Sequence, residues 1–259
     1  VRSRRQRQMC IRDRIVNEHP ETAAKAKKYI GIKEYIFKKL FDQYVVDYSL
    51  ASAMGMMNLK TLAWDEEALT VAGITPDHLS KLVPTTAIFH HCNPELAAMM
   101  GIDPQTPFVI GASDGVLSNL GVNAIKKGEI AVTIGTSGAI RTIIDKPQTD
   151  EKGRIFCYAL TENHWVIGGP VNNGGIVLRW IRDEFASSEI ETAKRLGIDP
   201  YDVLTKIAER VRPGADGLLF HPYLAGERAP LWNPDVRGSF FGLTMSHKKE
   251  HMIRAALEG

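Results

Sequence analysis

A β-rich run that stops at glycines and hydroxyls, and then resumes, is the feature that most constrains this chain. Ile130–Ile134 (IAVTI) leads into Gly135–Gly138 (GTSG), and the apolar pattern continues at Ala139. Two strands joined by so short a connection predict an antiparallel hairpin. A tight turn by itself accounts for the glycines. The second interpretation is that the loop receives an anion, because small residues leave backbone N–H groups open to phosphate oxygens.

A strand, a turn and a helix are predicted just before this hairpin. Phe108–Ile110 has the pattern of a buried strand, Gly111–Gly115 (GASDG) that of a turn, and a helical pattern follows. In an α/β protein such a turn lies at the edge of the sheet, where ligands bind. Asp114 is therefore either a plain turn former, since Asp-Gly pairs favour turns, or a carboxylate exposed for catalysis.

The remaining predicted elements are also a mixture of helices and strands. Periodicity predicts helices over 21–41 (with Tyr29, Ile32, Ile36 and Leu40 on one face), after Asp65, from Gly174 and over 246–259, and strands near 129–144, 155–160 and 165–168.

Two glycines open one of these helices. Gly174 and Gly175 precede an apolar face formed by Ile176, Val177, Trp180, Ile181 and Phe185. The glycines either let a nucleotide approach the positive end of the helix, or permit another segment to pack closely there. Both interpretations stay open at this point.

Composition excludes several classes of protein. The chain is 44% hydrophobic and 24% charged, as is usual for a globular protein. A formal net charge of +2 argues neither for nor against nucleic acid, and we expect no nucleic-acid partner. No apolar run approaches the ~20 residues that span a bilayer, so we expect no membrane partner. Cys10, Cys92 and Cys157 are too widely spaced for a disulfide framework or a CxxC pair, which favours a reducing, cytoplasmic setting.

Both ends of the sequence lead us to expect an internal fragment of a longer protein. Residues 1–14 carry six arginines without apolar periodicity, and we expect them to be a non-native or disordered basic segment outside the fold. A basic arm for nucleic acid is the alternative. The helix over 246–259 is still in progress where the sequence stops.

One stretch of the sequence matches a metal-binding pattern. His247-Lys-Lys-Glu-His251 fits the H-x-x-E-H pattern of inverted zinc peptidases. On a helix the two histidines would lie opposite the apolar face of Met252, Ile253, Ala256 and Leu257, so we interpret them as part of a solvated face. We therefore predict no metal-ligating residue, and a zinc peptidase stays the alternative that metal analysis would test.

The order of these motifs is more specific than any one of them. GASDG, GEIAVTIGTSG and GGPVNNGGIVLRW follow one another, and GSFFGLTMSHKKEHMIRAALE ends the series at Glu258. This series resembles the FGGY family of carbohydrate kinases, whose second signature is similar to residues 238–258. VVDYSLASAMGMMNLKTLAWDEEAL is similar to the family segment that runs from D-x-S-x-A-S into a tryptophan-led helix. The resemblance covers about Ile15 to Gly259.

The resemblance implies an α/β fold, namely the ribonuclease-H/actin-like two-domain sugar kinase fold, with both domains incomplete. Residues 15–126 would be the C-terminal part of the sugar-binding domain, and residues 127–259 the N-terminal part of the ATP-binding domain. The family's first phosphate loop and its adenine-binding segment have no counterpart here. We therefore expect residues 1–259 alone to be inactive.

The resemblance also implies roles for individual residues. Asp114 matches the family's catalytic base. Gly135 and Thr136 match the hairpin that wraps the phosphates of ATP, while Gly175 and Arg179 match nucleotide-facing positions. ATP and Mg²⁺ are the implied cofactors, because phosphoryl transfer depends on positioning and on neutralising charge.

The substrate is implied by the resemblance alone. The stretch from Gly111 to Arg141 is most similar to bacterial family members that phosphorylate gluconate, which implies ATP-dependent conversion of D-gluconate to 6-phosphogluconate. Xylulose, glycerol and related polyols are alternative substrates, and a non-catalytic actin-like nucleotide-binding protein is the alternative class. The expected partners are a small-molecule sugar or sugar acid and, in the assembly, a second copy of the chain as a homodimer.

Overall fold

The structure is a computed structural model that describes residues 14–259. All but the last residue of the predicted basic segment at 1–14 lies outside the described residues. The chain forms two compact units. The first runs to Ala131 and includes Arg141–Gly168, and the second comprises Val132–Ile140 and Gly169–Gly259.

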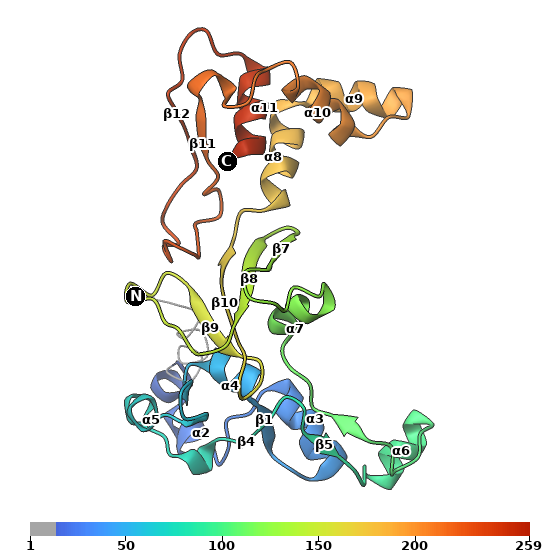
Figure 1. Cartoon of the computed structure of the whole chain (residues 1–259), viewed down its shortest axis with the longest axis vertical. Helices are drawn as coiled ribbons and strands as arrows, with labels where there is room; N and C mark the ends of the chain where they lie inside the picture. The colour runs from blue at the N-terminus through green and yellow to red at the C-terminus, as the bar shows by residue number, and fades with distance from the viewer. Residues whose placement is uncertain (1–13) are drawn as a thin grey trace. The chain divides into compact units, whose positions relative to one another are not determined.

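The first unit contains short helices and paired strands (Figure 1). Its elements are α2 (Pro20–Lys25), α3 (Ile32–Phe41), β1 (Val45–Asp47), α4 (Tyr48–Met54), β2 (Met57–Asn58), β3 (Ala63–Trp64), α5 (Glu66–Ala72), η1 (Pro76–His78), β4 (Lys81–Val83), β5 (Ile88–Phe89), α6 (Pro94–Met100), β6 (Phe108–Val109) and α7 (Asp114–Gly121). β1 pairs in parallel with β4. β2 pairs antiparallel with β3, and β5 pairs antiparallel with β6.

β1 is buried along its whole length, and its last residue starts the next helix. Val45, Val46 and Asp47 are all buried, as expected for a strand with both faces covered. The Asp47 side chain accepts hydrogen bonds from the amides of Ser49 and Leu50, so it caps α4. α4 then lies against β9 (Phe156–Ala159) of the next sheet (Figure 1).

The helix predicted over 21–41 is wrong as one element, because it is broken between α2 and α3. In the break, the Tyr29 amide donates to the His78 carbonyl at 2.8 Å, and Lys28 Nζ donates to the Leu79 carbonyl at 2.7 Å. The expected apolar face is not the buried one either, because Ile32 is 76% exposed. Contacts with a distant turn therefore override a helical pattern in the sequence.

The predicted strands near 129–144, 155–160 and 165–168 are confirmed. β7 (Ile130–Ile134), β8 (Gly138–Ile144), β9 and β10 (Trp165–Val171) form one sheet in the order β7-β8-β10-β9. β9 and β10 are antiparallel, with Cys157 opposite Ile167. β7, β8 and β10 each continue from one compact unit into the other. The boundary expected between residues 126 and 127 stays a prediction, because the chain passes between the two units three times, each time within one of these strands.

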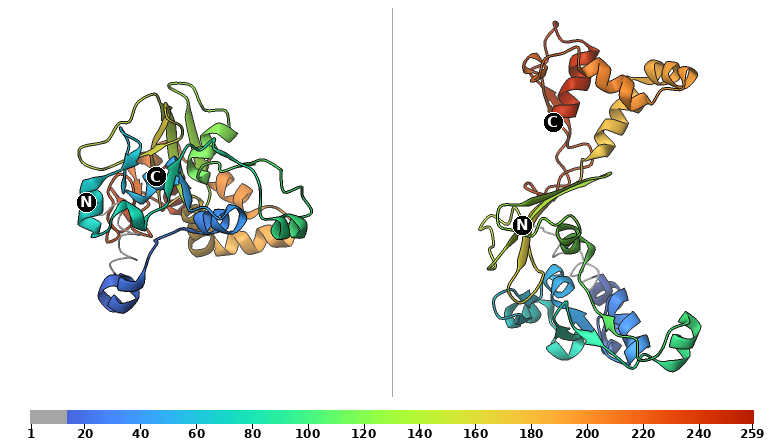
Figure 2. Two further views of the ribbon diagram at one scale, coloured as in Figure 1. Left: turned by 90° about the horizontal axis from the view of Figure 1, so that it is seen from below. Right: turned by 45° about the vertical axis from the view of Figure 1, so that its right-hand side comes forward.

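The second unit is mainly helical around one core. Its further elements are α8 (Gly175–Phe185), α9 (Ser187–Leu196), α10 (Pro200–Ala208), η2 (Ala215–Gly217), β11 (Leu219–His221), β12 (Ser239–Phe241) and α11 (Lys249–Glu258). β11 and β12 are antiparallel, and β11 packs along α11 (Figure 2). The predicted apolar face of α8 is confirmed, because Val177 and Ile181 are buried in this core. Leu257 is an exception to the face predicted for α11, since it is 40% exposed.

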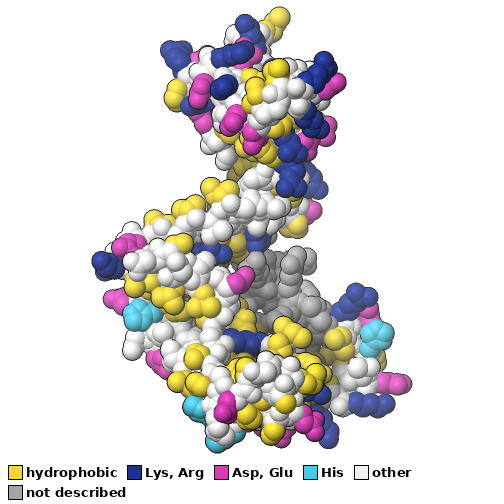
Figure 3. Space-filling view, turned by 90° about the vertical axis from the view of Figure 1, so that its right-hand side faces the viewer, with side chains coloured by type: hydrophobic (Ala, Val, Ile, Leu, Met, Phe, Trp, Pro, Cys, Tyr) yellow, Lys and Arg dark blue, Asp and Glu magenta, His cyan; other side chains and the backbone are white. Residues whose placement is uncertain are grey.

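On the face shown in Figure 3, lysine and arginine side chains of the second unit are interspersed with aspartate and glutamate. Within residues 14–259, no helix is both long and apolar enough to cross a bilayer.

Candidate active site

The GTSG loop connects β7 to β8 and is hydrogen-bonded to the start of α8, within the second unit. The Gly175 amide donates to the Gly135 carbonyl at 2.7 Å, and the Gly174 amide donates to the Thr136 carbonyl at 3.2 Å. The loop also closes on itself, because the Gly135 amide donates to the Ser137 carbonyl at 2.8 Å. The structure therefore brings Gly135, Thr136 and Gly175 together, three of the residues that the sequence analysis selected.

The two glycines before α8 are explained by this contact. A Cβ added at Gly174 would lie 2.8 Å from the Ser137 carbonyl carbon, and one added at Gly175 would lie 2.9 Å from the Gly135 oxygen. Real Cβ atoms do not approach backbone so closely. Close packing, one of the two interpretations left open by the sequence, is thus sufficient to account for both glycines.

The tip of the loop has polar groups that these contacts do not use. Thr136 and Ser137 are exposed, and across residues 14–259 no acceptor is found for their amides. Two hydroxyls and two amide donors on a short loop suit phosphate oxygens, as in other anion-binding turns. The residues present therefore fit the phosphates of a nucleotide.

Arg179 lies on α8, one helical turn beyond Gly175, with an exposed side chain. A hydrogen bond from Arg182, and more weakly the charge of Arg179, hold the pKa of Asp183 below its ordinary value. Arg179 therefore contributes a positive charge to the same helix that contacts the loop.

A buried glutamate, which the sequence analysis missed, ties the segment before α8 to a distant loop. Glu227 is 4% exposed. Its carboxylate accepts from the Asn172 amide at 2.8 Å, from Asn173 Nδ2 at 3.1 Å and from the Arg228 amide at 2.7 Å. Asn173 Nδ2 also donates to the Gly226 carbonyl at 2.8 Å. An acidic residue within Gly226–Pro230 (GERAP) was the available signal, but no pattern in the neighbouring sequence shows that it is buried.

Asp114 lies in the first unit, as the first residue of α7. Its side chain is exposed, and its Oδ1 accepts from the Gly115 amide at 2.7 Å. A carboxylate at this position is favoured by the positive end of a helix. The geometry leaves the second carboxylate oxygen available to a hydroxyl of a ligand.

The turn that leads to Asp114 is fixed by a hydrogen-bonded chain beneath it. The Ser113 amide donates to Ser49 Oγ at 2.7 Å, and Ser49 Oγ donates to Asp47 Oδ1 at 2.5 Å. Lys33 Nζ donates to Asp47 Oδ2 at 2.7 Å and to the Gly111 carbonyl at 3.1 Å. Neither Lys33 nor Ser49 was predicted from the sequence to be a site residue.

The positively charged side chain of Arg141 lies beside the same turn. A Cβ placed at Gly115 would lie 3.9 Å from two guanidinium nitrogens of Arg141, and Arg141 Nη1 donates to Ser118 Oγ at 3.3 Å. Arg141 is on β8, and Ile143 of the same strand packs with Val116 of α7. Arg141 lies three residues after GTSG, on the side of β8 that faces α7. Its position in the sequence was the available signal, but only the tertiary structure shows that it faces α7.

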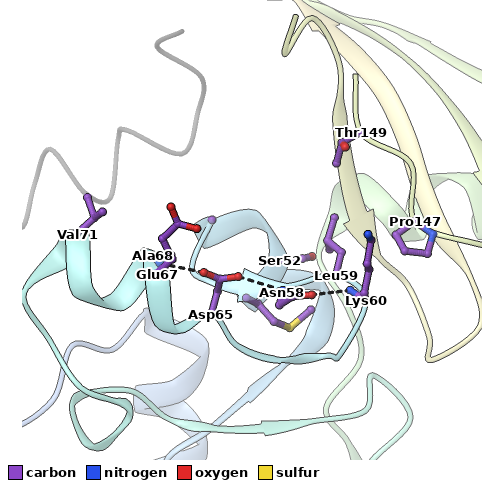
Figure 4. A pocket seen from close by; sticks show the side chains of 12 residues that line it. Ser52, Asn58, Leu59, Lys60, Asp65, Glu67, Ala68, Val71, Pro147 and Thr149 are labelled. Carbon is purple, nitrogen blue, oxygen red and sulfur yellow. Dashed lines mark hydrogen bonds between the residues drawn. The ribbon is translucent and has the colours of Figure 1, made fainter. Parts of the chain in front are cut away.

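A pocket of about 500 Å³ in the first unit is formed by other residues (Figure 4). Asn58 Nδ2 donates to Asp65 Oδ2 at 3.1 Å, and the Asn58 side chain accepts from the Lys60 amide at 3.0 Å. Hydrogen bonds from the Ala68 amide and from Asn58 hold the pKa of Asp65 below its ordinary value. These groups shape the β2–β3 hairpin and cap α5, and none of the predicted site residues lines the pocket.

The two histidines of the HKKEH pattern are engaged in local structure. His247 Nδ1 accepts from the Thr244 amide at 2.9 Å, and His251 Nε2 lies 3.3 Å from Asp216 Oδ2. The His251 side chain is 14% exposed, so the solvated face expected for it is wrong. Among residues 14–259, no group of three or more His, Cys, Asp or Glu side chains is placed to hold a metal ion.

Comparison with known proteins identifies the chain's family. Residues 13–121 match the sequence profile of the N-terminal domain of the FGGY family of carbohydrate kinases, and residues 130–259 match the profile of its C-terminal domain. The chain is 98% identical to the gluconokinase of Bacillus licheniformis over 95% of its own length. That alignment covers 48% of the relative, so the chain spans about half the length of the curated relatives it matches.

Solved structures agree with this assignment. A gluconate kinase from Lactobacillus acidophilus aligns with a TM-score of 0.89 and 41% identity, over 97% of this chain and 49% of the other. A structure described as a ligand-bound xylulose kinase from the same organism aligns with the same values. The predicted two-domain sugar kinase fold is thereby confirmed. The chain belongs to the FGGY family of carbohydrate kinases.

Proposed function

We propose that this chain supplies the catalytic base and one phosphate-binding loop of an ATP-dependent gluconate kinase. The observation that carries the proposal is the 98% identity with a gluconokinase over 95% of the chain. Because that relative is about twice as long, the activity proposed is that of a longer protein with this sequence inside it. Identity with the xylulose kinase of Bacillus subtilis is only 27%, which favours gluconate over xylulose.

In the proposed reaction, Asp114 acts as the general base. The terminal hydroxyl oxygen of the sugar forms a bond to the γ-phosphorus of ATP, and the bond from that phosphorus to the β–γ bridging oxygen breaks. The hydroxyl proton passes to the Asp114 carboxylate. The exposed carboxylate at the first position of α7 supports this role, because a base must reach the proton that it removes.

The GTSG loop is proposed to hold the phosphates of ATP. The amides of Thr136 and Ser137 and the Thr136 hydroxyl donate to phosphate oxygens, while Gly135 and Gly175 keep the loop against α8. Arg179 adds a positive charge on the nucleotide side. Mg²⁺, when bound with ATP, would supply positive charge that offsets the charge of the phosphates, and it is usually held by few protein groups.

Arg141 is proposed to recognise the carboxylate of gluconate. Xylulose and glycerol lack this group, so a gluconate site needs a cation or several N–H donors. Arg141 lies beside the first turn of α7, in the same compact unit as Asp114. A guanidinium can donate two parallel hydrogen bonds to a carboxylate, which favours arginine for this role.

The cellular location and the partners of the enzyme are also proposals. Widely spaced cysteines, two of which are buried, favour a reducing cytoplasm. A sugar acid is the proposed partner. The homodimer and the absence of a nucleic-acid partner stay predictions.

A substrate panel tests the proposed function. A full-length gluconokinase that carries this stretch in its matching region is assayed for ADP release with D-gluconate, D-xylulose and glycerol. We expect the highest kcat/KM for D-gluconate. An equal or higher kcat/KM for D-xylulose contradicts the choice of substrate. ATP binding without sugar-dependent ADP release from any of the three contradicts the assignment as a kinase.

A further inference from the structure

A buried ion pair lies under the turn that presents Asp114. The Asp47 side chain is fully buried, and its partner Lys33 has a side chain that is 22% exposed. Removing two such charges from water costs free energy, and this cost is offset only when hydrogen bonds satisfy both groups. A pair of this kind therefore calls for a reason beyond stability.

The Asp47 carboxylate is fully used. Its Oδ1 accepts from the Ser49 amide at 3.0 Å, the Leu50 amide at 3.1 Å and Ser49 Oγ at 2.5 Å, while Oδ2 accepts from Lys33 Nζ. Because the Ser49 hydroxyl gives its only proton to Asp47, its lone pairs are left to accept. They accept from the Ser113 amide.

The turn is thus fixed at two points. Ser49 Oγ binds the amide of Ser113, and Lys33 Nζ binds the carbonyl of Gly111. These two groups lie on either side of Ala112, and Gly111 has a φ of +66°, which an L side chain rarely adopts. The residue after Ser113 is Asp114, so both bonds act on the backbone that aims its carboxylate.

We propose that Lys33, Asp47 and Ser49 are positioning residues for the catalytic base. The inference rests on the proposed role of Asp114. None of the three is proposed to touch the substrate. They hold the Gly111–Ser113 turn in one conformation. A shift of about 1 Å in a reacting group can cost about 100-fold in rate, so loss of either fixed point would lower kcat.

The test begins with Ser49→Ala in the full-length enzyme that carries this stretch. This change removes the bond to Ser113 but leaves Asp47 capping α4 and paired with Lys33. We expect kcat to fall by about 10- to 100-fold while the KM for ATP stays within about twofold. Thermal unfolding is measured alongside.

Ser52→Ala is the matched control. Ser52 is on the same helix and is 6% exposed. Its Oγ accepts from the Ala159 amide at 3.1 Å and donates to the Ser49 carbonyl at 2.9 Å, and neither partner is in the Gly111–Ser113 turn. Both variants lose one buried hydroxyl that accepts from a distant backbone amide. We expect similar losses of thermal stability but a kcat within about twofold of the original for Ser52→Ala. Equal kcat values for the two variants would overturn the inference.

A double-mutant cycle separates positioning from general loosening of the fold. In the Asp114→Asn background there is no base to position, so Ser49→Ala should change the residual kcat by less than about twofold. A fall by the same factor in both backgrounds would overturn the inference. If Ser49→Ala does not fold, Lys33→Met combined with Asp47→Asn removes both charges together, and the same cycle is read with that variant.

These outcomes are distinct from failure of the proposed function. If the unaltered enzyme phosphorylates no sugar, the proposed kinase activity fails. If it does, and Asp114→Asn lowers kcat by about 100-fold or more while Ser49→Ala behaves as Ser52→Ala does, only the positioning inference fails.

Discussion

The amide of Gly175 donates to the carbonyl of Gly135 at 2.7 Å, so the GTSG loop and the first turn of α8 form one hydrogen-bonded unit. The contact explains two sequence features at once. It gives the hairpin its fixed conformation, and it requires that no Cβ stand between the two backbones. We propose that the tip of the loop meets phosphate in this fixed conformation, so that little ordering is needed on binding.

A methyl group at Gly175 should disturb this unit. The Cβ in Gly175→Ala would lie 2.9 Å from the Gly135 oxygen, and overpacking of this kind costs about 1–3 kcal/mol. We expect the KM for ATP to rise about 10- to 100-fold and the KM for the sugar to change much less. Gly121→Ala is the control, because nothing lies within 4 Å of its Cβ position.

Thr136→Val approaches the same loop from its exposed side and leaves the packing against α8 intact. It should also raise the KM for ATP more than that for the sugar. If either variant instead affects mainly the sugar, the loop belongs to the sugar site.

Asp114→Asn should keep the fold and ATP binding but lower kcat by about 100-fold or more, because an amide cannot accept the proton of the hydroxyl. Steady-state kinetics and nucleotide titration measure the two effects. Asp77→Asn, at another exposed aspartate in the first turn of a helix in the same unit, serves as the control. Near-normal turnover in Asp114→Asn would remove this residue from the mechanism.

Arg141→Gln should reduce discrimination between substrates. Hydrogen bonds to charged groups contribute about 1.5–3 kcal/mol, so kcat/KM for D-gluconate should fall about 10- to 150-fold, with a much smaller change for D-xylulose. Arg141→Lys keeps the charge without the planar fork and should be intermediate. An equal fall for both sugars would show that Arg141 supports α7 through Ser118 and does not recognise the carboxylate.

Glu34 gives a pH dependence of stability. Burial raises the pKa of this carboxyl above its ordinary value of 4.5, and the charge of Asp47 adds to the effect; the nearby Ser80 hydroxyl, a hydrogen bond from the Gly31 amide and the charge of Lys28 oppose it. The folded state therefore holds the proton more tightly than the unfolded state does. The contribution of Glu34 to the free energy of unfolding is largest below pH 4.5 and falls as the pH rises through the folded-state pKa.

Glu34→Gln removes this titration. The difference in unfolding temperature between the original protein and Glu34→Gln should therefore shift in favour of the variant between pH 4 and pH 7. A shift in the opposite direction would contradict the raised pKa.

The edge strand β7 should make the isolated chain self-associate. Ile130, Val132 and Ile134 alternate along one face of the strand and are 59%, 60% and 75% exposed. Exposed apolar edge strands pair with other chains. We expect residues 1–259 expressed alone to scatter light and to show no sugar-dependent ATP turnover. Val132→Lys should reduce the scattering, whereas Met99→Lys, at a residue 82% exposed on α6, should not.

Patterns that repeat locally determined much of this protein. The hairpin at GTSG, the order of strand, turn and helix around Asp114, and the buried face of α8 were predictable from the sequence, because periods of two and 3.6 residues report which side chains share a face. The strand predicted as buried over Phe108–Ile110 is wrong in that respect, since Val109 is 58% exposed. The two glycines before α8 also marked a special position, although two explanations fitted them equally.

Only the tertiary structure revealed the close packing at these glycines and the hydrogen bonds beneath the turn that carries Asp114. The bonds from Lys33 to Asp47, from Ser113 to Ser49 and from Lys33 to Gly111 join residues 14, 64 and 78 positions apart. Such pairs leave no periodic trace, since one hydrogen bond between distant segments constrains two single residues and no repeating pattern. The break in the helix predicted over 21–41 has the same origin, because its backbone groups are bonded to the residues of a distant turn.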